Sequence, residues 1–378
     1  MMPVHAACAL LSLAPLLVLS VPPIWTQPEQ VHLSYPGVPG SMVVTWTTFN
    51  KTESNVEYGL LGGRLFEVTA GGNDTLFVDS GEEKRKMFIH RVTLTGLKPA
   101  ATYVYHCGSD EGWSDVFSFT ALNDSASFSP RFALYGDLGN ENPQSLARLQ
   151  KETQLGMYDV ILHIGELHTD KSTDNARIGD EFMRQIQSIA AYVPYMTCPG
   201  NHEAPYNFSN YRNRFSMPGQ TESLWYSWNL GSAHIISFST EVYFYLEFGL
   251  ELLFKQYEWL KKDLEEANKP ENRAVRPWII TMGHRPMYCS DDDQDDCTTF
   301  DSYGCREKTD RFNLNPKEWS ALRSTDYGYT RMQVVNTTHV YLEQVSDDQA
   351  TDILPLLCLL RVNQFTTVKG FDVSSQIC

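Results

Sequence analysis

Short runs in which apolar and polar residues alternate fill the first third of the chain and predict β-strands there. Turn residues such as glycine and proline separate these runs. We predict strands at residues 31–35, 42–46, 56–58, 87–94, 103–107 and 117–119. Strands this short, packed into about a hundred residues, indicate a β-sandwich.

The pattern changes after residue 128, where strongly apolar runs alternate with longer segments of helical periodicity. We predict strands at residues 131–135, 160–164, 195–198, 233–239 and 277–282. We predict helices at residues 143–157, 176–191 and 250–267. Alternation at this spacing indicates βαβ units, so we expect an α/β domain built on a largely parallel sheet.

Four polar residues follow the carboxyl ends of predicted strands, and a glycine before each permits a tight turn: Asp137, Glu166, Asn201 and His284. Ligands bind at this edge of α/β sheets because loops converge there. Two carboxylates, an amide oxygen and an imidazole suit divalent and trivalent metals. Each residue alone has an ordinary structural role, such as a helix cap for Asp137, but their shared position favours a site.

Charge excludes one class of function. The chain has 46 acidic and 30 basic residues, which gives a net charge of −16. A field of this sign repels phosphate backbones, and no basic cluster offsets it, so we expect no binding to nucleic acid. The acidic run at residues 291–296 lacks the regular ligand spacing of a calcium loop and is interpreted as a solvated loop.

The N-terminus predicts export. Residues 6–21 are almost wholly apolar, too few to span a bilayer, and followed by two prolines, which is typical of a signal peptide. No later segment is long and apolar enough to cross a membrane. Asn-X-Ser/Thr sequons predict glycosylation at Asn50, Asn73, Asn123, Asn207 and Asn336. We therefore expect a secreted or lumenal glycoprotein without a transmembrane segment.

Cys8 lies in the predicted signal peptide, so seven of the eight cysteines would remain after its cleavage. Cys289 and Cys297 are the candidate disulfide, since in an oxidising compartment they would close a small loop around the acidic run. The odd number leaves at least one thiol free or paired between chains.

Three segments resemble the motifs of metallophosphoesterases. Residues 136–139 read GDLG, like GDxG; residues 200–203 read GNHE, like GNH(D/E); and residues 281–286 read TMGHRP, like VxxH. Trp46 in an early strand and a segment like a tyrosine corner at residues 97–103 resemble a fibronectin type III domain. Together these features resemble the purple acid phosphatase family in its long animal form, from about residue 28 to residue 349.

This resemblance implies a fold and its division along the chain. We expect an N-terminal fibronectin type III-like β-sandwich, followed by an α/β metallophosphoesterase domain in which a β-sheet sandwich is flanked by helices. We expect this second domain to be truncated. The implied segments are a signal peptide at 1–26, the sandwich at 27–122, the catalytic domain at 128–303, its C-terminal remnant at 304–349 and a divergent tail at 350–378.

The resemblance also implies a dinuclear site that holds iron and a second divalent metal, which is zinc, iron or manganese. It places Asp137 on the first metal, Glu166 as the bridging ligand, and Asn201 and His284 on the second metal. It implies that His202 contacts the substrate phosphate and protonates the leaving group.

The chain departs from the family pattern in two places. The motif GDxxY reads GELHT at residues 165–169, so a glutamate replaces the bridging aspartate and Thr169 replaces the tyrosine ligand; we therefore expect no purple colour. The motif GHxH has no counterpart, because His339 is the only histidine after His284. The block that carries this motif is missing near residue 304, and we expect its loss to expose a sheet edge.

The expected function is a secreted metal-dependent acid phosphatase that hydrolyses phosphate monoesters. The alternatives are a catalytically inactive glycoprotein that acts in binding or structure, a single-metal phosphatase of low activity, and a truncated isoform that does not fold stably. His163, His168 and Asp170 are candidate substitute ligands. The expected partner is a phosphomonoester substrate, and a homodimer is left open.

Overall fold

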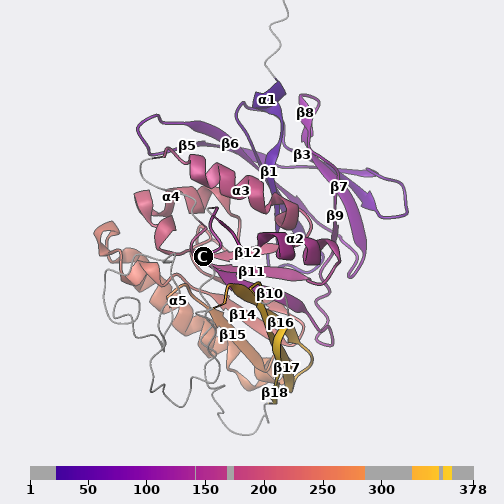
Figure 1. Ribbon diagram of the computed structural model, residues 1–378, viewed down its shortest axis with the longest axis vertical. Coiled ribbons are helices and arrows are strands. Elements are labelled where there is room, and N and C mark those ends of the chain that lie inside the picture. Colours follow the sequence, from indigo (N-terminus) through magenta and orange to yellow (C-terminus); the bar gives the residue numbers. More distant parts are fainter. Residues whose placement is uncertain (1–22, 141, 168–173, 286–325, 349–351, 360–378) are drawn as a thin grey trace, which may run out of the picture.

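The computed structural model describes residues 23–140, 142–167, 174–285, 326–348 and 352–359 (Figure 1). The N-terminal part is a sandwich of two sheets, preceded by the short helix α1 (Pro23–Thr26). One sheet has the strand order β1-β2-β6-β5, and the other has the order β4-β3-β7-β8 with β9 also paired to β7. The strands are β1 (Glu29–Ser34), β2 (Met42–Thr48), β3 (Asn55–Leu60), β4 (Val68–Gly71), β5 (Asn73–Val78), β6 (Lys86–Leu94), β7 (Thr102–Ser109), β8 (Gly112–Trp113) and β9 (Phe117–Thr120).

Apolar side chains that point inward from both sheets form the core of this sandwich. Trp46 is fully buried and stacks on His90, with ring centroids 5.0 Å apart. The hydroxyl of Tyr103 accepts a hydrogen bond of 2.9 Å from the backbone N–H of Lys98. This contact is the tyrosine corner that the sequence predicts.

The α/β domain contains two further sheets. The larger has the order β12-β11-β10-β16-β17-β18, and the smaller has the order β13-β14-β15. Their strands are β10 (Arg131–Gly136), β11 (Val160–Ile164), β12 (Tyr195–Cys198), β13 (Tyr226–Leu230), β14 (Ala233–Ser237), β15 (Trp278–Met282), β16 (Gly328–Val334), β17 (His339–Ser346) and β18 (Asp352–Leu359). The predicted bounds of β11 and β12 are confirmed to the residue.

The prediction of a largely parallel sheet is wrong. Strands β10, β11 and β12 are parallel, but β16, β17 and β18 join the same sheet in antiparallel pairings. A short turn links β16 to β17, and such a turn can join only antiparallel neighbours, because a parallel pairing needs a long crossover.

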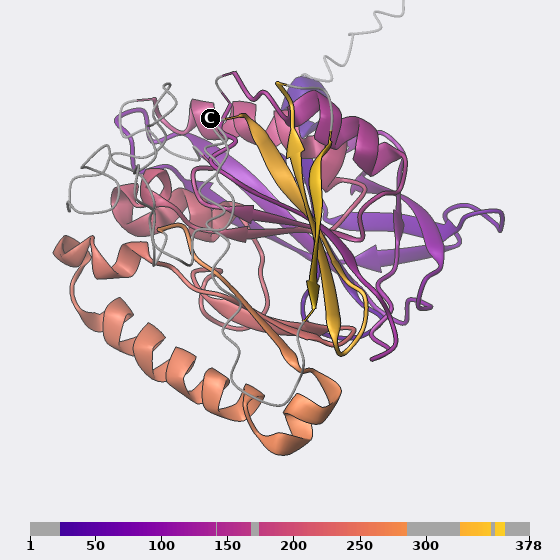
Figure 2. The same cartoon turned by 60° about the horizontal axis from the view of Figure 1, so that its bottom comes forward.

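The domain is layered. Helices α2 (Leu146–Gln154) and α3 (Arg177–Ala190) cover one face of the larger sheet, and the smaller sheet packs on the other face. Helix α5 (Glu251–Ala267) lies on the outside of the smaller sheet (Figure 2). The remaining helical segments are η1 (Asn201–Glu203), α4 (Pro205–Arg214), η2 (Glu241–Tyr243), η3 (Leu246–Phe248) and α6 (Pro270–Val275). None of the described helices combines the length and apolarity needed to cross a bilayer.

A buried ion network joins the N-terminal sandwich to the α/β domain. Asp180 of α3 accepts hydrogen bonds from Arg214 at 2.8 Å and from Arg85 of the sandwich at 2.6 Å. Arg214 also donates to Gln30 of β1 at 3.0 Å. Because Asp180 and Arg214 are both buried, removal of the Asp180 carboxylate leaves the Arg214 cation without compensation, so the network fixes how α3 sits on β1.

The outer side of the smaller sheet is incompletely covered. Among the described strands, β15 pairs only with β14, and Trp278, Ile279 and Ile280 on β15 are partly exposed. Helix α5 also exposes apolar side chains, with Phe254 at 59% and Tyr257 at 55%. An apolar edge of this kind agrees with the loss of neighbouring strands that the sequence predicts.

Candidate metal centre

Parallel pairing brings three of the predicted ligands to one edge of the larger sheet. Gly136 of β10 pairs with Ile164 of β11, and Ile164 pairs with Cys198 of β12, so the loops after these strands begin side by side. These loops carry Asp137, Glu166 and Asn201. The fourth candidate, His284, arrives from the smaller sheet because it follows β15.

The four side chains converge. Ligand atoms of Asp137, Glu166 and His284 all lie within 4.8 Å of one another. His284 Nδ1 lies 3.4 Å from Asp137 Oδ1, and His284 Nε2 lies 2.8 Å from Asn201 Oδ1. The cluster sits inside the protein, since Glu166 is 1% exposed and Asn201 is 8% exposed.

His284 is held in the neutral form that binds metals. Burial, reinforced by the neighbouring cation of Arg285, lowers the pKa of His284 to about 3. A neutral imidazole keeps a lone pair for a metal, whereas an imidazolium has none. The site therefore combines two acidic side chains, one amide and one neutral imidazole.

Two glycines make room for this cluster. Gly165 has φ +74°, and a Cβ there would lie 2.1 Å from His284 Nδ1. A Cβ on Gly200 would lie 2.6 Å from the backbone nitrogen of Glu166. Asp137 and Glu166 themselves adopt left-handed backbone angles, with φ of +55° and +47°. Strained residues of this kind persist where surrounding contacts fix them, and they gather at functional sites.

His202 lies at the mouth of the cluster on η1. Its Nε2 is 3.4 Å from Glu166 Oε1, and its side chain is 30% exposed, so it can reach both the buried carboxylate and a molecule from solvent. The next residue, Glu203, is fully buried and accepts a hydrogen bond of 2.8 Å from the backbone N–H of Gly200. This bond fixes the loop on which Asn201 and His202 are carried.

The structure adds a support for His284 that sequence reasoning missed. The Arg285 guanidinium binds the fully buried Glu241 through Nε at 3.0 Å and Nη2 at 2.9 Å, and stacks 4.1 Å above the Phe244 ring. The Arg285 backbone N–H donates to Thr240 Oγ1 at 3.1 Å. The position of an arginine directly after His284 was the one available signal, because Glu241 comes from a distant segment.

His163 does not reach the site. Its Nδ1 lies 2.7 Å from the hydroxyl of Tyr195, and its ring contacts Phe182 of α3 with centroids 5.8 Å apart. It therefore faces the helical layer, because side chains alternate between the two faces of a strand. The other proposed substitutes, His168 and Asp170, lie outside the described residues, as does Thr169.

The donors of this cluster suffice for one metal ion but not for two. Ligands of a zinc-sized ion lie at about 2.0–2.2 Å, and a catalytic ion has about three protein ligands. Asp137, Glu166, Asn201 and His284 meet this need for one ion. Two metals about 3.5–4 Å apart need two such sets, and the described part of the chain supplies one. The described residues therefore fit a single ion and do not fit a pair.

The other sequence predictions lie on the surface or outside the described residues. The five sequon asparagines are all partly or largely exposed: Asn50, Asn73, Asn123, Asn207 and Asn336. The structure does not test whether they are glycosylated. Cys289 and Cys297 lie outside the described residues, and the described Cys107 and Cys198 are buried free thiols.

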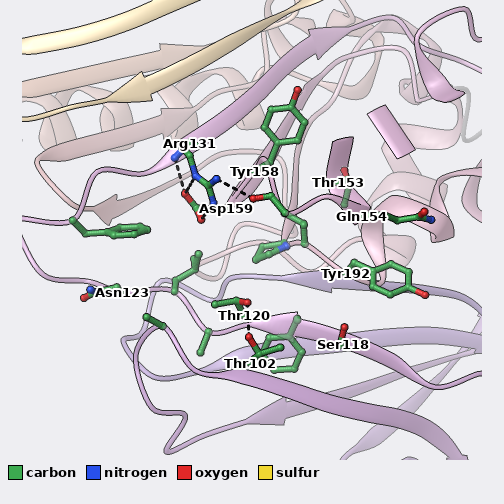
Figure 3. Close-up of a pocket in the computed structure, with 18 residues that line it drawn as sticks. Thr102, Ser118, Thr120, Asn123, Arg131, Thr153, Gln154, Tyr158, Asp159 and Tyr192 are labelled. Carbon is green, nitrogen blue, oxygen red and sulfur yellow. Dashed lines mark hydrogen bonds and ion pairs between the residues drawn. The ribbon is translucent and has the colours of Figure 1, made fainter. Parts of the chain in front are cut away.

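A separate cavity of about 380 Å³ lies where the N-terminal sandwich meets the α/β domain (Figure 3). Arg131 and Asp159, which form an ion pair of 2.9 Å, line it at the amino ends of β10 and β11. Asp137 and Glu166 follow the opposite ends of these strands. The length of a strand, about 16 Å for five residues, separates the cavity from the metal cluster.

Three families match successive parts of the chain. Residues 28–121 match the family described as "Purple acid Phosphatase, N-terminal domain". Residues 130–316 match "Calcineurin-like phosphoesterase", and residues 304–353 match "Iron/zinc purple acid phosphatase-like protein C". The second match contains the whole metal cluster described above.

Curated relatives match almost from end to end. The chain is 59% identical to a Danio rerio protein named "Acid phosphatase type 7", with 90% of this chain and 92% of the relative covered. It is 47% identical to the Homo sapiens protein of the same name, with 88% and 91% covered. A purple acid phosphatase isolated from yellow lupin (Lupinus luteus) seeds has the same fold, with a TM-score of 0.71, 20% identity and coverage of 90% of this chain and 78% of that chain.

The comparison with the Danio rerio protein also measures what this chain lacks. The alignment spans 409 positions but includes only 90% of the 378 residues, about 340, so about 70 positions are gaps in this chain. The coverage figures do not place these gaps along the chain, so the missing block near residue 304 stays a prediction.

Proposed function

Because the chain belongs to the purple acid phosphatase family, as its motifs predicted, we propose that it is a secreted, metal-dependent acid phosphatase that hydrolyses phosphate monoesters. The observation that carries the proposal is the convergence of Asp137, Glu166, Asn201 and His284 at one sheet edge. Secretion rests on the apolar N-terminal segment and the sequons alone.

In this proposal, four side chains hold the metal and His202 handles the proton. A divalent ion bound there supplies Lewis-acid chemistry that offsets negative charge on a phosphoryl oxygen. Asp137 and Glu166 provide the negative charge that retains the ion, while Asn201 and His284 add neutral donors. The Arg285–Glu241 pair keeps His284 aligned toward the other ligands.

His202 is the candidate general acid of the mechanism. It lies on the solvent side of Glu166, where a phosphate ester would enter, and its side chain is partly exposed. Acidic solution favours the imidazolium form of an accessible histidine, which can donate a proton to the leaving-group oxygen.

The inactive-glycoprotein alternative has one observation in its favour. The described residues supply donors for a single ion, whereas the family relies on a two-metal clamp around the attacking and leaving oxygens. A protein that folds, binds metal and does not turn over substrate would fit this alternative.

The test is hydrolysis of p-nitrophenyl phosphate at about pH 5 by metal-loaded protein, with His202→Asn as the variant and His339→Gln as the matched control. We expect His202→Asn to lower kcat by about 100-fold or more. We expect His339→Gln to change little, because His339 begins β17 and is hydrogen-bonded to Asn336 in the adjoining turn, outside the metal cluster. Hydrolysis that is unchanged in His202→Asn, or unaffected by a chelator, would overturn the mechanism.

A further inference from the structure

We infer that this chain binds one metal ion, held jointly by Asp137, Glu166, Asn201 and His284, in place of the two-metal centre that the family resemblance implies. The resemblance divides these donors between two metals. The inference rests on the proposed function for what the site does, whereas the number of ions is inferred from the donors in the described part of the chain.

Histidine positions limit the number of ions first. The chain has ten histidines, and eight lie in the described residues. His284 and His202 are the described histidines at the cluster. The others make contacts elsewhere, in the sandwich, beneath α3, beside α5 or at the start of β17: His32, His90, His106, His163, His234 and His339.

The geometry of the cluster allows one shared ion. Ligand atoms of Asp137, Glu166 and His284 lie within 4.8 Å of one another. Ligand atoms around one tetrahedral zinc-sized ion lie about 3.3–3.6 Å apart, so the set has to contract by up to about 1.5 Å to share an ion. Asn201 Oδ1 and His284 Nε2 are hydrogen-bonded at 2.8 Å, so these two donors are adjacent in the cluster.

Charge points the same way. When ionised, Asp137 and Glu166 together supply two negative charges, which balance one divalent ion, while Asn201 and a neutral His284 add none. A second cation in this buried cluster would lack compensation, because Thr169 stands where the family has a phenolate ligand. An uncompensated buried charge is strongly unfavourable.

The test counts bound ions in two ligand variants, one for each metal of the two-metal arrangement: Asp137 would bind the first metal and Asn201 the second. Full-length protein is stripped of metal, loaded with cobalt(II) and weighed by native mass spectrometry as wild type, Asp137→Asn, Asn201→Leu and the control His339→Gln. Under a shared ion, wild type and control bind one cobalt per chain, and each ligand variant lowers its affinity at least tenfold. The electron paramagnetic resonance of bound cobalt is then that of an isolated ion.

Three results would overturn the inference: two ions per chain, a spin-coupled cobalt pair, or one ion that depends on Asn201 but not on Asp137. Circular dichroism of each metal-free variant separates loss of binding from loss of folding, and Asp137→Asn preserves side-chain volume. The ion count does not depend on hydrolysis, which is measured separately in the test of the proposed function, so the two proposals can fail independently. One ion without turnover contradicts the phosphatase proposal alone, and turnover with two ions contradicts this inference alone.

Discussion

Replacement of Gly165 by alanine is the sharpest test of how the cluster is packed. A Cβ at this position would meet His284 at three ring atoms, 2.1, 2.5 and 2.9 Å away. To restore an ordinary contact of 3.4 Å, the ring has to move by about 1.3 Å, the difference between 3.4 and 2.1 Å. His284 cannot move freely, because Arg285 beside it is bound to Glu241.

The matched control is Gly156→Ala. Gly156 has almost the same backbone angle, φ +71° against +74°, but no atom lies within 4 Å of its Cβ position. Alanine in this conformation costs about 1 kcal/mol at either position. Gly165→Ala adds overpacking, about 1–3 kcal/mol, and a weakened hydrogen bond from His284, about 1 kcal/mol.

The assay is urea unfolding of the metal-free variants, followed by titration with cobalt. We expect Gly165→Ala to lose about 2–4 kcal/mol more than Gly156→Ala in the free energy of unfolding, and to bind cobalt at least tenfold more weakly. Equal losses in the two variants, or unchanged cobalt affinity in Gly165→Ala, would refute the packing argument.

Three further predictions concern the rest of the fold. Asp180→Asn should lower the free energy of unfolding by about 3–5 kcal/mol at neutral pH, because Arg214 is left buried without its partner; a loss under 1 kcal/mol by urea unfolding would contradict this. Burial resists ionisation of Asp180, but Arg214 and Arg85 outweigh it and lower its pKa, so this stabilisation should persist at mildly acidic pH and disappear only below the ordinary aspartate range. Burial lowers the pKa of His90 to about 4, so near pH 5 the unfolded chain binds a proton on His90 that the folded protein does not bind. The free energy of unfolding should therefore fall by about 2 kcal/mol between pH 7 and pH 5. His90→Gln should flatten this part of the dependence of stability on pH, and an unchanged slope would contradict the assignment. Phe254 is 59% exposed on α5, so Phe254→Glu should change the free energy of unfolding by less than about 0.5 kcal/mol. The same substitution should reduce any self-association seen by light scattering, because it removes an exposed apolar side chain. A loss of several kcal/mol would mean that Phe254 is packed.

Sequence reasoning succeeded where a strand is buried on both faces. Strands β11 and β12 read as mostly apolar runs and were predicted to the residue, whereas β4, with no buried residue, was missed. Strand β16 was also missed, because its apolar pattern is interrupted by Arg331, which pairs with Glu343 of β17 at 2.9 Å and also binds Glu152 of α2. Because β16 was missed, the antiparallel half of the larger sheet was not predicted.

The site shows the same division. Position after a strand end identified Asp137, Glu166, Asn201 and His284, because topology alone gathers such residues at one edge. Orientation could not be read in this way: His163 lies only three residues before Glu166, yet it faces α3. The role of Glu241 was also hidden, because it exists only through a contact with Arg285 that the fold creates.

The central claim is that the remaining donors bind metal and support phosphate ester hydrolysis. The most direct measurement is p-nitrophenyl phosphate turnover by purified protein, with metal content determined on the same sample, for wild type and Asn201→Leu. The account predicts metal-dependent turnover in the wild type, and loss of both metal and turnover in the variant. Folded wild-type protein that carries metal in this cluster and shows no turnover would contradict it.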